Sequence, residues 1–180
     1  CTGKADNQTA TTSGQASGEL SGMKIAYVEI DTLLSQYNFC IDLNEGMVKK
    51  SENVRLTLNQ KARELDKQKQ DFQTKYQNNA YLSPERAQQE YNRIAKLEQD
   101  LQTLSNKLQS ELMSENEKNS LQLRDSINAF LKEYNKTKGY SMIISNTGFD
   151  NLLYADSIYN ITKEIVEGLN ARYSSPAPKK

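Results

Sequence analysis

The stretch that decides the fold is Arg93–Leu108, RIAKLEQDLQTLSNKL. Its apolar residues recur at alternating steps of three and four: Ile94, Leu97, Leu101, Leu104 and Leu108. On an α-helix this spacing places them along one narrow stripe, as at the a and d positions of a coiled coil. The sequence therefore predicts a long helix whose apolar stripe packs against a second helix.

The second helix is expected just before this stretch, within residues 43–134, which contain only one Pro and one Gly. Its seven-residue step is weaker and is carried by Leu58, Leu65 and Phe72. Between the two helices, residues 78–82 interrupt the pattern. Ser83, Pro84 and Glu85 then suit the cap, first position and first turn of a new helix. We predict an antiparallel hairpin with a tight break at 78–82.

Each helix of this hairpin would be about 35 to 50 residues, or roughly 55 to 75 Å long at 1.5 Å per residue. An ordinary globular helix is about 11 residues long. The apolar residues expected between the two helices are Leu58, Leu65, Phe72, Ile94, Leu97, Leu101, Leu104 and Leu108. Such a narrow seam buries little surface, so the hairpin is expected to be a loosely packed arm.

Elements of a small body flank the arm on both sides. Before it, Met23–Ile30 is β-branched and aromatic, as a central strand is, and Asp31-Thr32 would cap a short helix at Leu33–Tyr37. After it, Lys136-Thr137-Lys138-Gly139 is a typical helix end.

Two strands and a helix are expected after that helix end. The strands are Tyr140–Ser145 and the short Leu152–Ala155, and the helix is Ile161–Tyr173. The apolar residues Leu121, Leu123, Ile127, Phe130, Leu131 and Tyr134 would join the returning helix to the body. Strands that flank the arm can pair only if the chain goes out and returns.

The predicted fold class is therefore α+β. The arm, residues 43–134, is an insertion into a body of residues 23–42 and 135–173. A body of about 60 residues is only marginally stable on its own and is expected to be stabilised by oligomerisation. Ile25, Val28, Met142 and Ile144 would form either its core or an interface between copies, and the sequence does not separate the two.

The chain begins with Cys1, and residues 1–22 are nearly all small or polar. That pattern resembles a mature bacterial lipoprotein, with the lipid on Cys1 and a flexible tether behind it. Residues 174–180 are expected to be a disordered tail. Cys40 is then left without a partner, and we expect a buried free thiol.

Composition excludes several function classes. The sequence of 180 residues has a formal net charge of zero and no His, and residues 43–138 hold 17 Lys and Arg against 14 Asp and Glu. A surplus of three charges does not favour nucleic-acid binding. Without His, the common nucleophile and zinc sites are absent, and there is no phosphate-binding glycine motif. We expect no enzyme activity, no catalytic residues, no cofactor and no metal.

Taken in order, the strand Lys24–Asp31, the long polar hairpin, Gly139–Ser145, Leu153–Asp156 and Ile161–Val166 resemble the Skp/OmpH family of periplasmic chaperones. The resemblance covers about residues 23–172. It implies a homotrimer in which three bodies form a hub and three arms enclose a cavity for unfolded outer-membrane proteins, without ATP. With Cys1 lipidated, the chain would be a membrane-anchored periplasmic lipoprotein of a Gram-negative bacterium.

The candidate client contacts are apolar residues near the arm tip, namely Tyr76, Tyr81, Leu82 and Tyr91. The alternative is that they pack on one another and hold the tip together. Two further functions stay open beside the chaperone: a structural coiled-coil spacer or assembly subunit of the cell envelope, and a prefoldin-like chaperone. In the latter the strands fall between the helices, whereas here they flank them.

Overall fold

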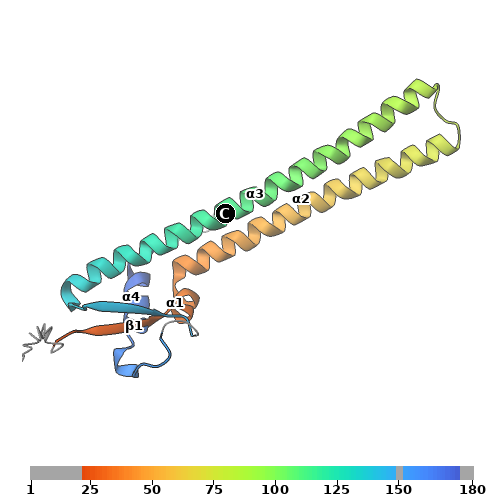
Figure 1. The fold of residues 1–180 in the computed structure, drawn as a ribbon. Helices are drawn as coiled ribbons and strands as arrows, with labels where there is room; N and C mark the ends of the chain where they lie inside the picture. The colour runs from red at the N-terminus through yellow and green to blue at the C-terminus, as the bar shows by residue number, and fades with distance from the viewer. Residues whose placement is uncertain (1–21, 149–151, 175–180) are drawn as a thin grey trace, which may run out of the picture.

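The structure is a computed structural model that describes residues 22–148 and 152–174. Two long helices, α2 and α3, form an antiparallel hairpin that projects from a small body of strands and short helices (Figure 1). The element order is β1 (Ile25–Glu29), α1 (Ile30–Gln36), α2 (Asn38–Gln77), α3 (Pro84–Lys138), β2 (Met142–Asn146), the 3-10 helix η1 (Ser157–Tyr159) and α4 (Thr162–Arg172). This confirms the predicted α+β fold with a helical arm.

The strands on either side of the arm pair with each other. β1 and β2 are parallel, with Ile25 opposite Met142 and Tyr27 opposite Ile144. On the other side of β1, Tyr27 forms an isolated parallel bridge with Asn160. The arm is therefore the long connection between two neighbouring strands, as the flanking pattern predicted, and their parallel direction is an addition that the structure makes.

The helix ends of the arm follow the local sequence signals. Ser83 has extended backbone and its hydroxyl accepts a hydrogen bond from the amide of Arg86, with Pro84 directly behind it. At the other end Gly139 adopts a left-handed conformation with φ 67°, which suits glycine because it lacks a Cβ. Both helices continue beyond the predicted arm limits, since α2 begins at Asn38 and α3 ends at Lys138.

One hydrophobic core lies where α3 meets the sheet and the short helices. Its buried members are Ala26, Val28, Leu33, Tyr37, Cys40, Phe130, Ile161, Ile165, Val166 and Leu169. Leu123, Ile127, Leu131 and Tyr134 of α3 pack against it, as predicted for the junction. The free thiol of Cys40 is buried, and this burial raises its pKa.

Polar contacts hold the base of α2 against α4. The side chain of Asn170 accepts from the amide of Asn38 and donates to the carbonyl of Gln36. The Tyr173 hydroxyl donates to Asp42 at 2.9 Å. These bonds bridge the break between α1 and α2, so they fix the direction in which the arm leaves the body.

Three details of the sequence analysis are wrong. Leu152–Ala155 forms no strand, because Leu152 and Ala155 lie over the face of the sheet rather than beside an edge, and Leu153 is 92% exposed. Asp31 and Thr32 do not cap α1, which begins earlier at Ile30. Leu121 is exposed, because it lies on the side of α3 away from the body.

The predicted tether 1–22 and tail 174–180 lie outside the described residues, apart from Gly22 and Ser174. The lipidation predicted at Cys1 therefore lies outside them too. No helix in the described part of the chain is long and apolar enough to cross a membrane.

Candidate functional site

The arm tip is held together by an aromatic cluster around Phe72. Its ring lies 5.9 Å from that of Tyr76, 5.7 Å from that of Tyr81 and 6.2 Å from that of Tyr91. These tyrosines come from α2, the turn and α3, so the cluster joins all three segments. Phe72 thereby gains a role at the tip beyond its predicted place in the seam.

The predicted client contacts at the tip separate into two kinds. The hydroxyl of Tyr81 is buried without a hydrogen-bond partner, and this desolvation raises its pKa. Leu82 is 98% exposed, whereas Tyr76 and Tyr91 are 62% and 56% exposed. Tyr81 is therefore partly buried, with its hydroxyl inside the tip, while the other three present apolar surface to solvent.

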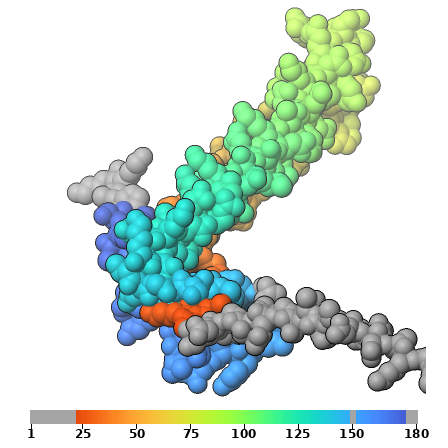
Figure 2. All heavy atoms as spheres, turned by 60° about the vertical axis from the view of Figure 1, so that its left-hand side comes forward, coloured from red at the N-terminus to blue at the C-terminus, as the bar shows by residue number. Residues whose placement is uncertain are grey.

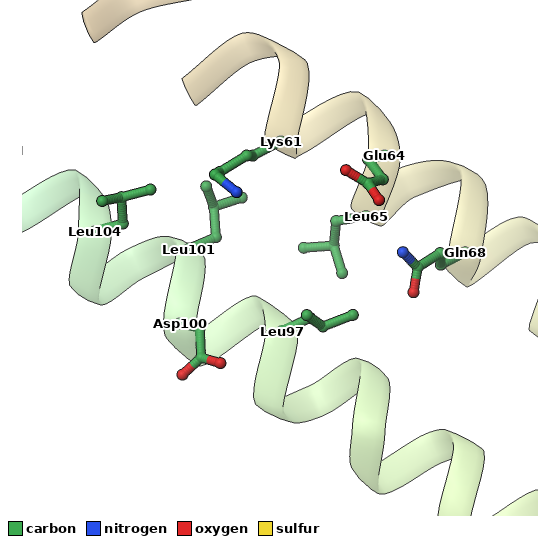
Figure 3. A pocket seen from close by; sticks show the side chains of 8 residues that line it. All are labelled: Lys61, Glu64, Leu65, Gln68, Leu97, Asp100, Leu101 and Leu104. Carbon is green, nitrogen blue, oxygen red and sulfur yellow. The ribbon is translucent and has the colours of Figure 1, made fainter. Parts of the chain in front are cut away.

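The middle of the arm contains a cavity that the sequence analysis missed (Figure 3). It has a volume of 210 Å³ and lies between α2 and α3, where Leu65 faces Leu97 and Leu101. The side-chain oxygen of Gln68 in its wall is buried without a partner. A polar residue on the inner side of α2 weakens the packing here, so the hairpin is loosely closed at this level.

Much of the remaining seam is only half buried. Leu65 and Ile94 are buried, whereas Leu58, Phe72, Leu97, Leu101, Leu104 and Leu108 are partly exposed. Two ion pairs cross between the helices, Lys50 with Glu115 and Lys69 with Glu98. The seam is therefore partly apolar and partly ionic.

A second accessible apolar surface lies near the base of the arm. Ile41, Val48 and Leu56 are exposed on α2. Leu56 lies opposite the seam residue Leu58, and Ile41 and Val48 lie on the flank of the helix, roughly a quarter to a third of a turn from the seam. The charged residues between them pair with each other, Glu45 with Lys49 and Glu52 with Arg55. The hydrogen bonds from Arg55 also lower the pKa of Glu52. We name Ile41, Val48 and Leu56 the basal strip.

Sequence reasoning missed the basal strip because Ile41 and Val48 keep a seven-residue step like that of the seam, and only the structure shows that they are exposed. Leu56, two residues before Leu58, is out of step with the seam, and this was the signal that could have pointed to the strip. The three residues of the strip show that the arm carries exposed apolar side chains at its base as well as at its tip.

The body residues predicted for core or interface lie on both faces of the sheet. Val28 points into the core beneath the helices. Because side chains alternate along a strand, Ile25 and its partner Met142 share the opposite face with Tyr27 and Ile144. Met142 is 50% exposed and Ile25 is also exposed. We name Ile25, Tyr27, Met142 and Ile144 the outer sheet face.

In the described residues no group of His, Cys, Asp or Glu is placed to hold a metal ion. The shape of the arm and the exposed apolar residues at both its ends are what a protein-binding surface requires.

Comparisons with known proteins agree with this architecture. The family model of outer membrane proteins that are OmpH-like matches residues 24–169. A crystal structure from Caulobacter crescentus, described as a candidate outer membrane chaperone of the OmpH-like type, has a TM-score of 0.75 at 12% identity. The alignment covers 89% of this chain and 91% of that one. The sequence matches no curated protein.

Proposed function

Because this chain belongs to the OmpH-like family, we propose that it is an ATP-independent holdase chaperone. It would bind unfolded outer-membrane or other envelope proteins between its arms and keep them from aggregating. One observation carries the proposal: a long, thinly packed arm exposes apolar side chains at its tip and at its base. Many weak apolar contacts on a projecting arm give affinity for unfolded chains through their number.

The working unit is proposed to be a homotrimer joined through the bodies. The outer sheet face supports this, because parallel sheets are normally covered on both faces, whereas Ile25 and Met142 on this face are 37% and 50% exposed. Three bodies whose outer sheet faces meet would bury Ile25, Met142 and Ile144. Figure 2 shows how narrow the arm is beside the body, so arms that project from such a hub would leave space between them.

The proposed location is the periplasm of a Gram-negative bacterium, with a lipid on Cys1 that holds the protein at a membrane. The polar stretch that follows Cys1 supports this, because a lipid-anchored domain needs a spacer.

The proposed client contacts are Tyr76, Leu82 and Tyr91 at the tip and the basal strip on α2. Each presents apolar surface that the arm itself leaves open. Tyr81 is proposed instead to hold the tip together through Phe72. A binding surface built from separate apolar points suits clients that differ in sequence.

The test uses the full chain with Cys1→Ser. A urea-unfolded outer-membrane barrel protein is diluted into buffer with and without it, and light scattering is followed in the absence of ATP. We expect suppression that saturates at about three chains per client, as one closed trimer per client requires. Unchanged light scattering at a large excess of the Cys1→Ser chain over the client would refute the chaperone proposal for this client class.

Variants connect the activity to the surface. We expect Leu82→Ser and Val48→Ser each to weaken client affinity about three- to tenfold, the loss of roughly 0.7 to 1.4 kcal/mol of apolar contact. Ile158→Ser is the matched control, because Ile158 is also exposed but belongs to η1 in the body. An equal loss with the control would mean that the arm is not the binding surface.

The alternative function is a structural spacer or assembly subunit of the envelope. A spacer needs a stiff arm and has no use for exposed apolar residues along it. The cavity beside Gln68 and the accessible basal strip both favour the chaperone. A chain that forms the trimer but leaves scattering unchanged would favour the spacer.

A further inference from the structure

The two helices of the arm are joined to the body in different ways. α3 enters the core as one unbroken helix, and its Phe130 is buried there. α2 is separated from α1 by a break at Tyr37, whose backbone is extended, with φ −82° and ψ 113°. The base of α3 is therefore continuous with the core, whereas the angle between α1 and α2 depends on the contacts that hold the break (Figure 1).

One side chain of α4 bonds to both sides of this break. The side-chain amide of Asn170 accepts from the backbone N–H of Asn38 at 2.8 Å and donates to the carbonyl of Gln36 at 2.9 Å. These two groups belong to the start of α2 and the end of α1, where backbone groups have no partner inside their own helix. Tyr37 gives α2 no side-chain cap. Asn170 therefore supplies, from a third helix, the hydrogen bonds that close the break.

Tyr173, at the end of the same helix, packs on the same break. Its ring lies 6.2 Å from that of Tyr37, and its hydroxyl donates to Asp42 at 2.9 Å. Tyr37 is itself buried, and its hydroxyl shares a hydrogen bond of 2.9 Å with Ser126 of α3. The break is thus held by α4 on one side and by α3 on the other. We name Asn170 and Tyr173 the clasp.

The length of the arm turns a small change at the break into a large movement at the tip. α2 has 40 residues and is about 60 Å long at 1.5 Å per residue, so a rotation of about 10° at its base would move the tip by roughly 10 Å. Bending the arm in the plane of its two helices requires one helix to shift along the other. The half-buried seam offers little resistance to this shift. The clasp opposes it by fixing the base of α2.

We propose that Asn170 is a positioning residue for client binding, and that the clasp sets the range of client sizes that the arms accept. This inference rests on the proposed function and adds a specificity determinant to it. Arms held within a narrow range of directions keep their apolar surfaces at a high effective concentration around a small client. The same restraint opposes the spreading of the arms that a large client requires. Asn170 acts through the direction of α2 and not through contact with the client.

The first test measures the direction of the arm without a client. Spin labels are attached at Gln60→Cys in α2 and Ile158→Cys in the body of the full chain with Cys1→Ser, because both positions are exposed. Labelled chains are diluted with an excess of unlabelled ones, so that double electron–electron resonance reports distances within one chain. We expect Asn170→Ala to broaden the distance distribution by roughly 5 Å, as a swing of about 10° halfway along α2 would give.

Glu167→Ala is the matched control for this measurement. Glu167 is exposed on the same helix as Asn170, and its ion pair is with Lys163 of that helix. This variant should leave the distance distribution unchanged. A chain without the two added cysteines shows whether the buried Cys40 takes up label. A distribution that stays as narrow in Asn170→Ala as in the parent chain would overturn the inference.

The second test compares clients of two sizes. Fluorescently labelled, unfolded barrel proteins of about eight and about sixteen strands are titrated with the Cys1→Ser chain and with its Asn170→Ala variant. We expect Asn170→Ala to weaken binding of the small client about three- to tenfold, while the large client binds at least as tightly as before. Glu167→Ala should change neither affinity. Equal weakening for both clients would mean a general loss of structure and would overturn the inference.

A covalent link tests whether holding the base of α2 is sufficient. The chain with Cys1→Ser, Asn38→Cys and Asn170→Cys is titrated before and after its two new thiols are joined by a short bismaleimide. We expect the unlinked chain to behave like Asn170→Ala, and the linked chain to recover the affinity of the parent for the small client to within about twofold. A linked chain that still binds weakly would contradict the inference, because its base is held and its client binding is not restored.

The outcomes separate this inference from the proposed function, because the label distances need no client. If the Cys1→Ser chain protects neither client from aggregation, the proposed function fails, and the role in client selection fails with it, whatever the labels show. If that chain protects both clients and Asn170→Ala leaves the ratio of the two affinities unchanged, the proposed function stands and this inference alone fails.

Discussion

Gly168 lies where α4 crosses α3, and it leaves the space that the Phe130 ring occupies. A Cβ added at Gly168 would overlap that buried ring. We predict that Gly168→Ala lowers the free energy of unfolding by about 1 to 3 kcal/mol, the usual cost of overpacking a core. This loss would exceed the gain of about 1 kcal/mol that alanine brings to a helix interior.

Gly46 provides the matched control, because it lies within α2 and a Cβ there meets open space. Gly46→Ala is expected to raise the free energy of unfolding by about 0.5 to 1 kcal/mol. Urea unfolding followed by circular dichroism, at one chain concentration, measures both variants. A stabilised Gly168→Ala would mean that α3 and α4 do not pack through Phe130.

Tyr173 makes the free energy of unfolding depend on pH in alkaline solution. Burial and the hydrogen bond to Asp42 raise its pKa to about 12 in the folded state, against about 10 in an unfolded chain. The folded state therefore holds this proton more tightly. The stabilisation is complete below about pH 10 and is lost as the pH rises towards 12. We predict that Tyr173→Phe lowers the melting temperature at pH 8 but flattens its decline between pH 10 and 12, measured by thermal unfolding.

At the scale of elements, the arm could be predicted because its signals are local. The seam spacing from Ile94 onward, the Ser83 cap and the left-handed Gly139 each depend on a few neighbouring residues. The body strands were also found, because β1 and β2 are rich in β-branched and aromatic residues. Their pairing followed from the need of the chain to go out and return, whereas their parallel direction was not predicted.

The features that could not be predicted from the sequence depend on tertiary contacts. Leu152–Ala155 has strand composition, but whether it becomes a strand depends on an available edge. Leu121 is apolar like Leu123, and only its direction around α3 leaves it exposed. At the tip, the aromatic residues were selected as a group, and the sequence could not show that their contacts with Phe72 bury the hydroxyl of Tyr81.

The looseness of the hairpin can be tested at Leu65, one of the few buried residues of its seam. Leu65→Ala would enlarge the cavity that already lies beside it, at a cost of about 2 to 5 kcal/mol. We expect hydrogen exchange to accelerate in the middle of α2 and α3 and to stay unchanged in β1 and α4. Leu56→Ala, on the exposed side of the same helix, should change neither. Equal acceleration throughout the chain would show that arm and body unfold as one unit.

For the whole molecule, a body completed by neighbouring copies should be stabilised by mass action. We predict that the melting temperature of the Cys1→Ser chain rises with chain concentration, because the folded assembly binds further copies and the unfolded chain does not. The measurement is calorimetry over about a hundredfold range of concentration, enough to shift the association term by roughly 2.7 kcal/mol. A constant melting temperature would indicate a body that is stable as a single chain.

The charges of the arm predict how clients are captured. Pairs such as Glu45 with Lys49 and Glu52 with Arg55 neutralise the surface around the basal strip, and residues 43–138 as a whole carry only three surplus positive charges. Exposed charges are screened over about 10 Å at 0.1 M salt, so an interaction that depended on them would weaken as salt rises. Apolar contacts do not weaken in this way.

We therefore predict that client affinity changes by less than about threefold between roughly 0.05 and 0.5 M NaCl, measured by fluorescence titration with a labelled unfolded barrel protein. Glu52→Lys reverses a charge beside Val48 and releases Arg55 from its partner, so this variant should bind an acidic client more tightly at low salt and lose that gain at high salt. Glu52→Gln is the control, because it removes the ion pair with Arg55 without placing a positive charge at this position. A steep salt dependence in the Cys1→Ser chain itself would mean that unpaired arm charge, and not the basal strip, attracts the client.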